Sequence, residues 1–263
     1  MSAISRRGAL AAAAGGAAAV TGTGAAAQAP QATQQTLFPL AQATIPVQGE
    51  ARAFPVRRIY CIGRNYAAHA REMGSDPSRE PPFFFQKPPD AVQVVAGRVA
   101  DHPYPSLTKN YHHELELVAM LKSGGRDIPA AKALDHVYGY ATGLDMTRRD
   151  LQRGMGDQKK PWEIGKSFDH SAPITPILPV ALVGHPARGR IRLSVNGTVR
   201  QDADLSQMIW SVAEQIANLS EAFELAAGDV IYSGTPENVG PVVRGDVLAG
   251  TIEGLPDLSI RIV

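Results

Sequence analysis

The chain has 263 residues, 44% of them apolar, and a formal net charge of +1. This size and composition allow a globular domain with a real core, and the near-neutral charge excludes the basic footprint of a nucleic-acid-binding protein. The single cysteine, Cys61, excludes an intramolecular disulfide and a thiolate metal cluster. Because Cys61 lies in an apolar run, we expect a packed core thiol rather than a reactive one.

The N-terminal segment indicates an export signal. Arg6 and Arg7 precede an Ala/Gly-rich stretch, and no side chain from Gly8 to Gln48 is charged. Paired arginines before an uncharged small-residue stretch are typical of a twin-arginine signal, and this stretch is too short and glycine-rich for a membrane span. We therefore predict a signal peptide over residues 1–29 and a periplasmic protein. An uncleaved alanine-rich tail on a cytoplasmic protein is the alternative.

Short strands dominate the rest of the chain. Residues 30–52 are rich in Gln, Thr and Pro and predict a linker or N-terminal arm, followed by a single catalytic domain over residues 53–263. Apolar runs bounded by Gly and Pro are typical of strands. In chain order we expect strands at residues 59–63, 114–120, 136–145, 191–195, 198–200, 230–232, 247–248 and 258–263.

Helices are fewer. Asn65 is expected to cap a helix over residues 66–73, a short helix is expected over 129–133, and helical spacing of apolar residues predicts a long amphipathic helix over 206–225. Asn196-Gly197, between two predicted strands, predicts a tight hairpin. The pattern as a whole favours a β-rich α+β fold.

Three carboxylates form the first candidate site. Glu114 and Glu116 alternate with leucines, so on a strand they share one face, and Asp145 ends another predicted strand. Taken alone, Glu-x-Glu describes a solvated strand face more often than a metal site. Here the strand continues into the apolar residues 118–120, so a bound cation would relieve the repulsion between buried carboxylates. Three oxygen ligands suit Mg²⁺ or Mn²⁺.

His69 and Glu72 form the second candidate. On a helix they share a face, so the carboxylate can orient the imidazole and raise its basicity. Taken alone, the two residues are better explained as a surface pair. Other chemistries are excluded: Lys160 stands where a phosphate-binding loop needs glycine, and the zinc-protease, nucleophile-elbow and dinucleotide-binding motifs are absent.

Taken in order, these stretches resemble the fumarylacetoacetate hydrolase family over nearly all of residues 54–263. The matching stretches lie at residues 60–69, 85–88, 113–117, 143–152, 165–169, 195–197 and 233–236. Agreement of so many motifs in order is far more specific than any one of them. The segment 236–239 departs from the family pattern, because Glu237 stands where a smaller residue is common.

The resemblance implies a fold and a set of site residues. The fold would be a mixed β-sandwich roll, usually a homodimer, with no nucleic-acid or membrane partner. Glu114, Glu116 and Asp145 match the metal ligands, and His69 and Glu72 match the pair that activates a water. Lys166 matches a further catalytic position, and the matches to substrate-binding positions are Arg149, Gln152, Thr235 and, as a weaker match, Arg64. Asn65 and Lys87 are weaker matches to lid or pocket positions.

The resemblance also implies a reaction. Within the family the chain is most similar to the compact acylpyruvate and fumarylpyruvate hydrolases of aromatic-compound catabolism. We therefore expect metal-dependent hydrolysis of a carbon–carbon bond in a small 1,3-diketo acid, with fumarylpyruvate giving fumarate and pyruvate as the leading case. The alternatives are decarboxylation of oxaloacetate or tautomerisation of a 2-oxo acid at the same metal site.

Overall fold

The computed structural model describes residues 36–74, 76 and 81–263. Residues Ala41–Val263 form one compact unit, and Met1–Leu40 are a separate unit. The predicted signal peptide (residues 1–29) and the first part of the predicted linker (residues 30–35) lie outside the described residues.

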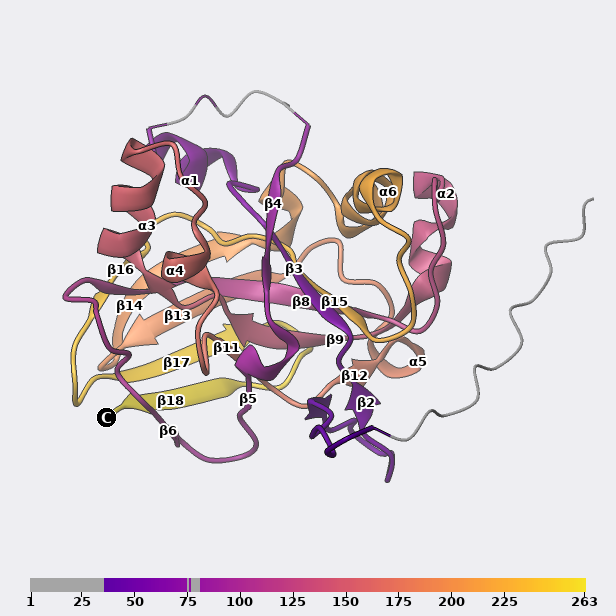
Figure 1. Ribbon diagram of the computed structural model, residues 1–263, viewed down its shortest axis with the longest axis horizontal. Helices are drawn as coiled ribbons and strands as arrows, with labels where there is room; N and C mark the ends of the chain where they lie inside the picture. Colours follow the sequence, from indigo (N-terminus) through magenta and orange to yellow (C-terminus); the bar gives the residue numbers. More distant parts are fainter. Residues whose placement is uncertain (1–35, 75, 77–80) are drawn as a thin grey trace, which may run out of the picture. The chain divides into compact units, whose positions relative to one another are not determined.

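Short strands and short helices alternate along the compact unit (Figure 1). The strands are β1 (Thr44–Ile45), β2 (Phe54–Pro55), β3 (Arg58–Ile62), β4 (Phe84–Lys87), β5 (Val92–Val94), β6 (Ala100–His102), β7 (Tyr111–His113), β8 (Leu115–Leu121), β9 (Val137–Leu144), β10 (Thr147–Arg148), β11 (Ala172–Ile174), β12 (Leu178–Pro179), β13 (Arg190–Val195), β14 (Thr198–Asp204), β15 (Asp229–Tyr232), β16 (Gly240–Val242), β17 (Val247–Ile252) and β18 (Leu258–Ile262). The α-helices are α1 (Ala67–Glu72), α2 (Ala130–Ala133), α3 (Arg149–Asp157), α4 (Glu163–Lys166), α5 (Val180–Val183) and α6 (Val212–Ala222).

The strands form mixed sheets. An 8-stranded sheet has the order β4-β3-β15-β8-β9-β11-β5, with β12 also paired to β9. A 5-stranded sheet has the order β14-β13-β17-β18-β6, and a 3-stranded sheet joins β10, β7 and β16. Strands β3 and β15 run parallel, whereas β8 and β9 run antiparallel. This arrangement confirms the β-rich α+β class expected from the sequence.

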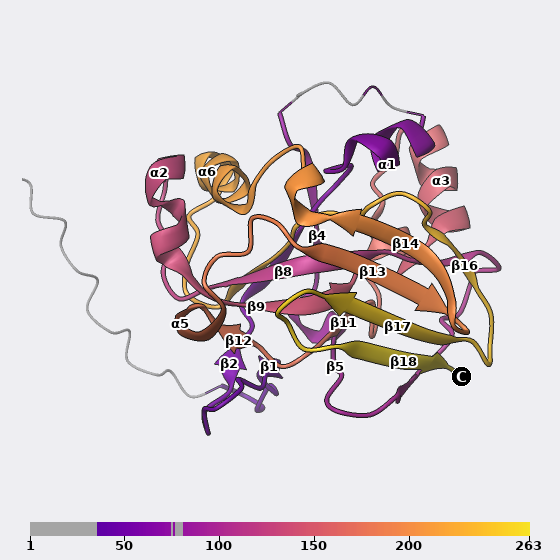
Figure 2. The same cartoon turned by 180° about the vertical axis from the view of Figure 1, so that it is seen from behind.

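The two faces of β8 belong to two different cores. Leu115 and Leu117 pack in one core with residues of β13, β17 and β18, whereas Val118 and Met120 pack in a second core with residues of β3 and β15. Figure 2 shows the 5-stranded sheet lying over β8 and β9. Because successive side chains of a strand point to opposite faces, Glu116 shares the face of Val118 and Met120. The strand therefore directs Glu116 away from the inter-sheet core.

The compact unit includes residues that lie before the predicted domain boundary at residue 53. The structure places β1 at Thr44–Ile45, pairs it with β2, and buries Ile45 and Val47 in the second core. We predicted a linker or N-terminal arm over residues 30–52, because this segment is rich in Gln, Thr and Pro. The few apolar residues of this segment give it enough buried surface to pack against the domain.

The hairpin prediction is confirmed, and the long-helix prediction is wrong at both ends. Asn196 and Gly197 both have positive φ, as a two-residue turn between β13 and β14 requires. Helix α6 covers only Val212–Ala222 of the predicted residues 206–225. The side chain of Ser211 caps its start and forms a reciprocal capping box with Glu214, which fixes the boundary there.

Asn65 does not cap α1, contrary to our prediction. The residue before this helix is Tyr66, and no side chain caps the helix start. The Asn65 side chain instead donates to the carbonyls of Trp210 and Ser233, at 2.9 and 2.7 Å, and accepts from the Trp210 amide at 2.8 Å. Asn65 thus joins three segments that are distant in sequence, which local capping rules cannot anticipate.

Helices α3 and α4 were not predicted, although both line the candidate site described below. Gly154 and Gly156 lower the helix propensity of α3, and its sequence has few apolar residues to set a period. Among the described residues, no helix is both long and apolar enough to cross a membrane.

His102 connects three sheets near the start of β7. Its Nδ1 lies 2.6 Å from Gln93 Oε1, so Nδ1 carries the hydrogen and donates, and Tyr111 donates its hydroxyl to Nε2 at 2.5 Å. Burial, with a smaller effect of His170, lowers the pKa of His102 from 6.5 to about 4. The folded protein therefore holds a neutral imidazole between β5, β6 and β7.

Acid should weaken the fold through His102. Between pH 6.5 and 4 the unfolded chain binds a proton at this residue that the folded chain does not, so stability falls as the pH drops through that window. Between pH 7 and 4.5 we expect the wild type to lose about 2 kcal/mol more stability than His102→Gln. Urea unfolding of both proteins at the two pH values measures this, and equal losses would contradict it.

Candidate active site

Antiparallel pairing of β8 and β9 brings the three predicted carboxylates together. Glu116 lies near the start of β8, Glu114 immediately precedes that strand, and Asp145 immediately follows β9. The Asp145 amide donates to the Glu114 carbonyl at 2.9 Å, which aligns the two strand ends. One oxygen of each carboxylate lies within 4.8 Å of the others, and each residue is at most 5% exposed.

Three buried cations contact two of these carboxylates. The Lys166 ammonium donates to Glu114 Oε2 at 2.9 Å and to Asp145 Oδ2 at 2.8 Å. Lys87 forms an ion pair with Asp145 Oδ1 at 2.9 Å, and the Arg149 guanidinium donates to Glu114 Oε1. Glu116 instead accepts a hydrogen bond from the Gly234 amide, at 2.8 Å. Among the described residues, Glu116 therefore has no cationic partner.

This difference appears in the acidities of the two glutamates. Burial of Glu114 favours its neutral form, but Lys166 and Arg149 outweigh burial and hold its pKa below the ordinary value. Burial, together with the charges of Asp145 and Glu114, raises the pKa of Glu116 well above the ordinary value. The cluster therefore has a deficit of positive charge on the side of Glu116.

The donor set fits a hard divalent cation. Mg²⁺ and Mn²⁺ prefer carboxylate oxygens and hold them at about 2.1 Å, so bound oxygens lie roughly 3–4 Å apart. The three carboxylates, with ligand oxygens within 4.8 Å of one another, come close to that spacing. A cation here would also supply the positive charge that Glu116 lacks. Glu114, Glu116 and Asp145 could thus hold a metal and leave further coordination positions toward the cavity.

The candidate base lies on α1. His69 Nδ1 lies 3.0 Å from Glu72 Oε2, and because a carboxylate only accepts, Nδ1 carries the hydrogen; in the neutral imidazole Nε2 then has the lone pair. The backbone amide of Asn238 donates to both oxygens of Glu72, at 3.1 Å each. Asn238 has a φ of 66° and follows Glu237, in the segment that departs from the family pattern. The backbone of that segment therefore holds the Glu72 carboxylate in place, and this carboxylate in turn orients the His69 imidazole.

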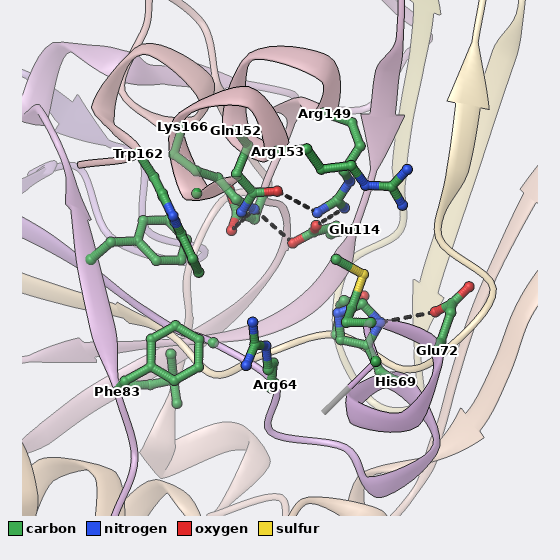
Figure 3. A pocket seen from close by; sticks show the side chains of 18 of the residues that line it. Arg64, His69, Glu72, Phe83, Glu114, Arg149, Gln152, Arg153, Trp162 and Lys166 are labelled. Carbon is green, nitrogen blue, oxygen red and sulfur yellow. Dashed lines mark hydrogen bonds and ion pairs between the residues drawn. The ribbon is translucent and has the colours of Figure 1, made fainter. Parts of the chain in front are cut away.

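A cavity of about 620 Å³ joins the two groups. Its lining includes the three carboxylates, His69 and Glu72, and the remaining residues predicted for the site, namely Arg64, Arg149, Gln152, Lys166 and Thr235. Figure 3 shows Lys166, Gln152 and Arg149 on one side of this space and Arg64, His69 and Phe83 on the other. All the residues predicted for the site, apart from the weaker pocket candidates Asn65 and Lys87, thus border one cavity.

Helix α3 lines the cavity with one face. Arg149, Gln152, Arg153 and Gly156 are spaced as neighbours on a helix surface, and all four border the cavity. Arg149 donates to Gln152 Oε1 at 2.6 Å, so the inner residues of this face hold each other in place. A Cβ on Gly165 of α4 would lie only 2.7 Å from the backbone of Gln152, so glycine permits the close approach of α4 to α3.

Thr235 borders the cavity, but its hydroxyl already has partners. It donates to the Leu115 carbonyl at 2.8 Å and accepts from the Gln201 amide at 2.9 Å. The residue that precedes it, Gly234, has a φ of 97°, and a Cβ there would lie 2.6 Å from Asn65 Cβ. The turn after β15 therefore has a fixed shape, which aims the Gly234 amide at Glu116.

Lys87 and Asn238 contribute to the site through contacts that the sequence did not predict. Lys87 was expected only as a general pocket residue, although a lysine beside an apolar run is a signal, because fully buried lysines are nearly always paired. Asn238 acts through its backbone amide, so its residue type carries no signal. Trp162 and Phe83, which form an aromatic wall with ring centroids 5.7 Å apart, come from segments without a recognisable motif.

The chain matches a known family model. Residues 58–263 match the model described as fumarylacetoacetate (FAA) hydrolase C-terminal. A fumarylpyruvate hydrolase from Ralstonia sp. is 41% identical over 187 residues, covering 71% of this chain and 95% of that protein. The human mitochondrial oxaloacetate tautomerase FAHD1 is 38% identical over 206 residues, covering 78% of this chain and 91% of that protein.

Solved structures agree with these matches. Fumarylpyruvate hydrolase from Pseudomonas aeruginosa, solved in complex with Mn²⁺ and pyruvate, superposes with a TM-score of 0.85 at 57% sequence identity, covering 87% of this chain and 99% of that one. A structure from Burkholderia cenocepacia, described as a putative fumarylpyruvate hydrolase, gives a TM-score of 0.80 at 43% identity, covering 87% of this chain and 98% of that one. The mixed β-sandwich roll expected from the sequence is therefore confirmed.

Proposed function

The chain belongs to the fumarylacetoacetate hydrolase family, and we propose that it is a divalent-metal-dependent enzyme that hydrolyses a carbon–carbon bond in a small acylpyruvate. The leading substrate is fumarylpyruvate, which would give fumarate and pyruvate. One observation carries this proposal: the buried carboxylate cluster and the His69–Glu72 pair border the same cavity. A metal site and a positioned base are the two parts that metal-assisted hydrolysis needs.

The metal would be Mg²⁺ or Mn²⁺, held by Glu114, Glu116 and Asp145. When bound, it would polarise the oxygens of the oxo-acid head and stabilise the negative charge that develops there. The Mn²⁺ and pyruvate in the Pseudomonas aeruginosa relative support this choice of ion and of substrate head.

His69 is the proposed general base. Its Nε2, free of the Glu72 hydrogen bond, takes a proton from a water, and the water oxygen bonds to the acyl carbonyl carbon that is joined to the pyruvyl methylene. The bond between that carbon and the pyruvyl methylene then breaks. Its electron pair passes to the pyruvyl fragment, which leaves as an enolate and takes a proton to become pyruvate. No covalent enzyme intermediate is needed.

The remaining site residues position the substrate and balance its charge. Lys166 and Arg149 place positive charge in the cavity wall beside Glu114, where the enolate charge would develop. Gln152, held by Arg149, offers its amide group to the substrate. We assign Thr235 to the carboxylate end of the oxo-acid, because it borders the cavity beside the turn that binds Glu116; its hydroxyl hydrogen would turn from the Leu115 carbonyl to the substrate carboxylate.

The second candidate is oxaloacetate chemistry at the same metal site, either decarboxylation or tautomerisation. The similarity to the human oxaloacetate tautomerase favours it. Oxaloacetate offers the same oxo-acid head for the metal, and its decarboxylation needs no attacking water. Hydrolysis and decarboxylation therefore differ in their need for His69 rather than for the carboxylates.

A substrate panel separates these functions. We expect the purified, chelator-treated protein to cleave fumarylpyruvate only after Mg²⁺ or Mn²⁺ is added, and to act on oxaloacetate with a lower kcat/KM. The assay follows loss of the diketo-acid absorbance and release of pyruvate. Turnover of oxaloacetate without cleavage of any acylpyruvate would make the second candidate the function.

Location and assembly remain proposals. We propose that residues 1–29 direct twin-arginine export of a folded protein to the periplasm, that residues 53–263 carry the activity, and that the enzyme is a homodimer. A fused reporter that stays cytoplasmic at full length would remove the export proposal.

A further inference from the structure

Arg64 has an unusual backbone conformation at the cavity wall. Its φ is 55°, in the left-handed region that residues other than glycine rarely adopt. Strained residues of this kind gather at functional sites, where the surrounding structure holds them in place. Arg64 follows β3 and precedes α1, it is half-buried, and it borders the cavity that contains the carboxylate cluster. This backbone conformation thus places the Arg64 guanidinium at the cavity.

Arg64 differs from the inner cations in its partners. Arg149, Lys166 and Lys87 each contact Glu114 or Asp145, so their charges are already matched. Within the described ranges, Arg64 contacts no carboxylate; its guanidinium carbon lies 5.3 Å from the centre of the Phe83 ring. A guanidinium held over an aromatic face keeps its in-plane N–H groups free for a planar anion.

The position of Arg64 suits the far end of a substrate. Figure 3 shows Arg64 and Phe83 across the cavity from Lys166, Gln152 and Arg149, which lie beside Glu114. Phe83 and Trp162 form an aromatic wall at this end. A substrate with its oxo-acid head at the carboxylate cluster would direct its acyl chain toward that wall. The trans double bond of a fumaryl group would pack there and carry its carboxylate away from the head.

We propose that Arg64 binds the distal carboxylate of the substrate and thereby makes the enzyme selective for dicarboxylic acylpyruvates over monocarboxylic ones. This inference rests on the proposed acylpyruvate hydrolase activity and adds the substrate class. Arg153 also borders the cavity, but it is exposed on α3, next to Arg149 in Figure 3. Arg153 therefore serves as the matched control, and Arg64 as the residue that binds the distal carboxylate.

The test compares two substrates that share the pyruvyl head. Fumarylpyruvate carries a distal carboxylate, whereas acetylpyruvate does not. For Arg64→Gln, kcat/KM for fumarylpyruvate should fall roughly 10- to 100-fold, while kcat/KM for acetylpyruvate changes less than about threefold. Arg64→Lys should recover part of the selectivity, and Arg153→Gln should keep the wild-type ratio. Because both rates come from one preparation, partial unfolding of a variant leaves their ratio unchanged.

The outcomes separate the two proposals. If the wild type cleaves both acylpyruvates and Arg64→Gln lowers both rates equally, the role of Arg64 is wrong and the hydrolase assignment stands. A change in the ratio with Arg153→Gln, and none with Arg64→Gln, also overturns the role of Arg64. If the wild type cleaves neither substrate with Mg²⁺ or Mn²⁺, the proposed function itself fails.

Discussion

Glu116→Ala should lower kcat by roughly 10³-fold or more and abolish the thermal stabilisation that Mn²⁺ gives the wild type. Glu116 is the one ligand carboxylate whose described contacts include no lysine or arginine, so its charge is the most directly available to a metal. Its removal breaks no ion pair, and the metal-free variant should remain folded. Melting curves with and without Mn²⁺, beside turnover of chelator-treated and reloaded protein, measure both effects.

A matched control uses an exposed glutamate. Glu221 lies on the exposed face of α6, outside the cavity, so Glu221→Ala should keep both the metal-dependent melting shift and turnover. At 100 times the dissociation constant, the stabilisation by metal should be about 2.7 kcal/mol for the wild type and the control. Unchanged activity of chelator-treated Glu116→Ala would end the metal-site account.

His69→Ala should slow acylpyruvate hydrolysis by about 10²- to 10⁴-fold and leave the Mn²⁺-dependent melting shift intact. His69 is buried, its Nδ1 is held by Glu72, and Glu72 is held by the Asn238 amide, so the imidazole is positioned as a base rather than as a metal ligand. Decarboxylation of oxaloacetate should persist, because that reaction needs no attacking water. Parallel assays with an acylpyruvate and with oxaloacetate measure how differently the substitution affects the two reactions.

A histidine outside the cavity supplies the control for that measurement. His185 is exposed and contacts Tyr140, so His185→Ala should leave both reactions unchanged. Hydrolysis retained in His69→Ala would mean that another group activates the water. Loss of the Mn²⁺-dependent melting shift in His69→Ala would instead indicate that His69 is a metal ligand.

The sequence was most informative where a local pattern determines the outcome. Alternation along residues 114–120 predicted that Glu114 and Glu116 share a face, and β8 buries its alternating leucines in the inter-sheet core. Asn196-Gly197 predicted the β13–β14 turn for an equally local reason, because both residues tolerate positive φ. Asp145 was predicted as the third carboxylate because it ends another predicted strand, and the family motifs supported that choice.

Long-range contacts explain what the sequence did not predict. Asn65 has the residue type of a helix cap, but its side chain binds Trp210 and Ser233, which are remote in sequence. The predicted helix over residues 206–225 has a continuous apolar period, yet the Ser211–Glu214 capping box starts it later. Helix α3 has two glycines and only two apolar side chains, Leu151 and Met155, and contacts with β7, β10 and α4 place it.

The charge balance of the site could not be predicted from residue types. Counting acids and bases gives no reason to single out Glu116, since Lys87, Lys166 and Arg149 would neutralise any three carboxylates. The structure distributes these cations unequally, onto Glu114 and Asp145. Glu116, whose pKa is raised by burial and by the charges of Asp145 and Glu114, is thus left without an ion pair to a lysine or arginine, which is the physical reason for placing a cation at this end of β8.

The most direct measurement is a crystal structure of the protein soaked with Mn²⁺, with anomalous diffraction recorded at the manganese edge. We expect one strong anomalous peak in the cavity, about 2.1–2.3 Å from an oxygen of each of Glu114, Glu116 and Asp145. A catalytically active crystal whose only manganese peak lies away from these three side chains would contradict the account.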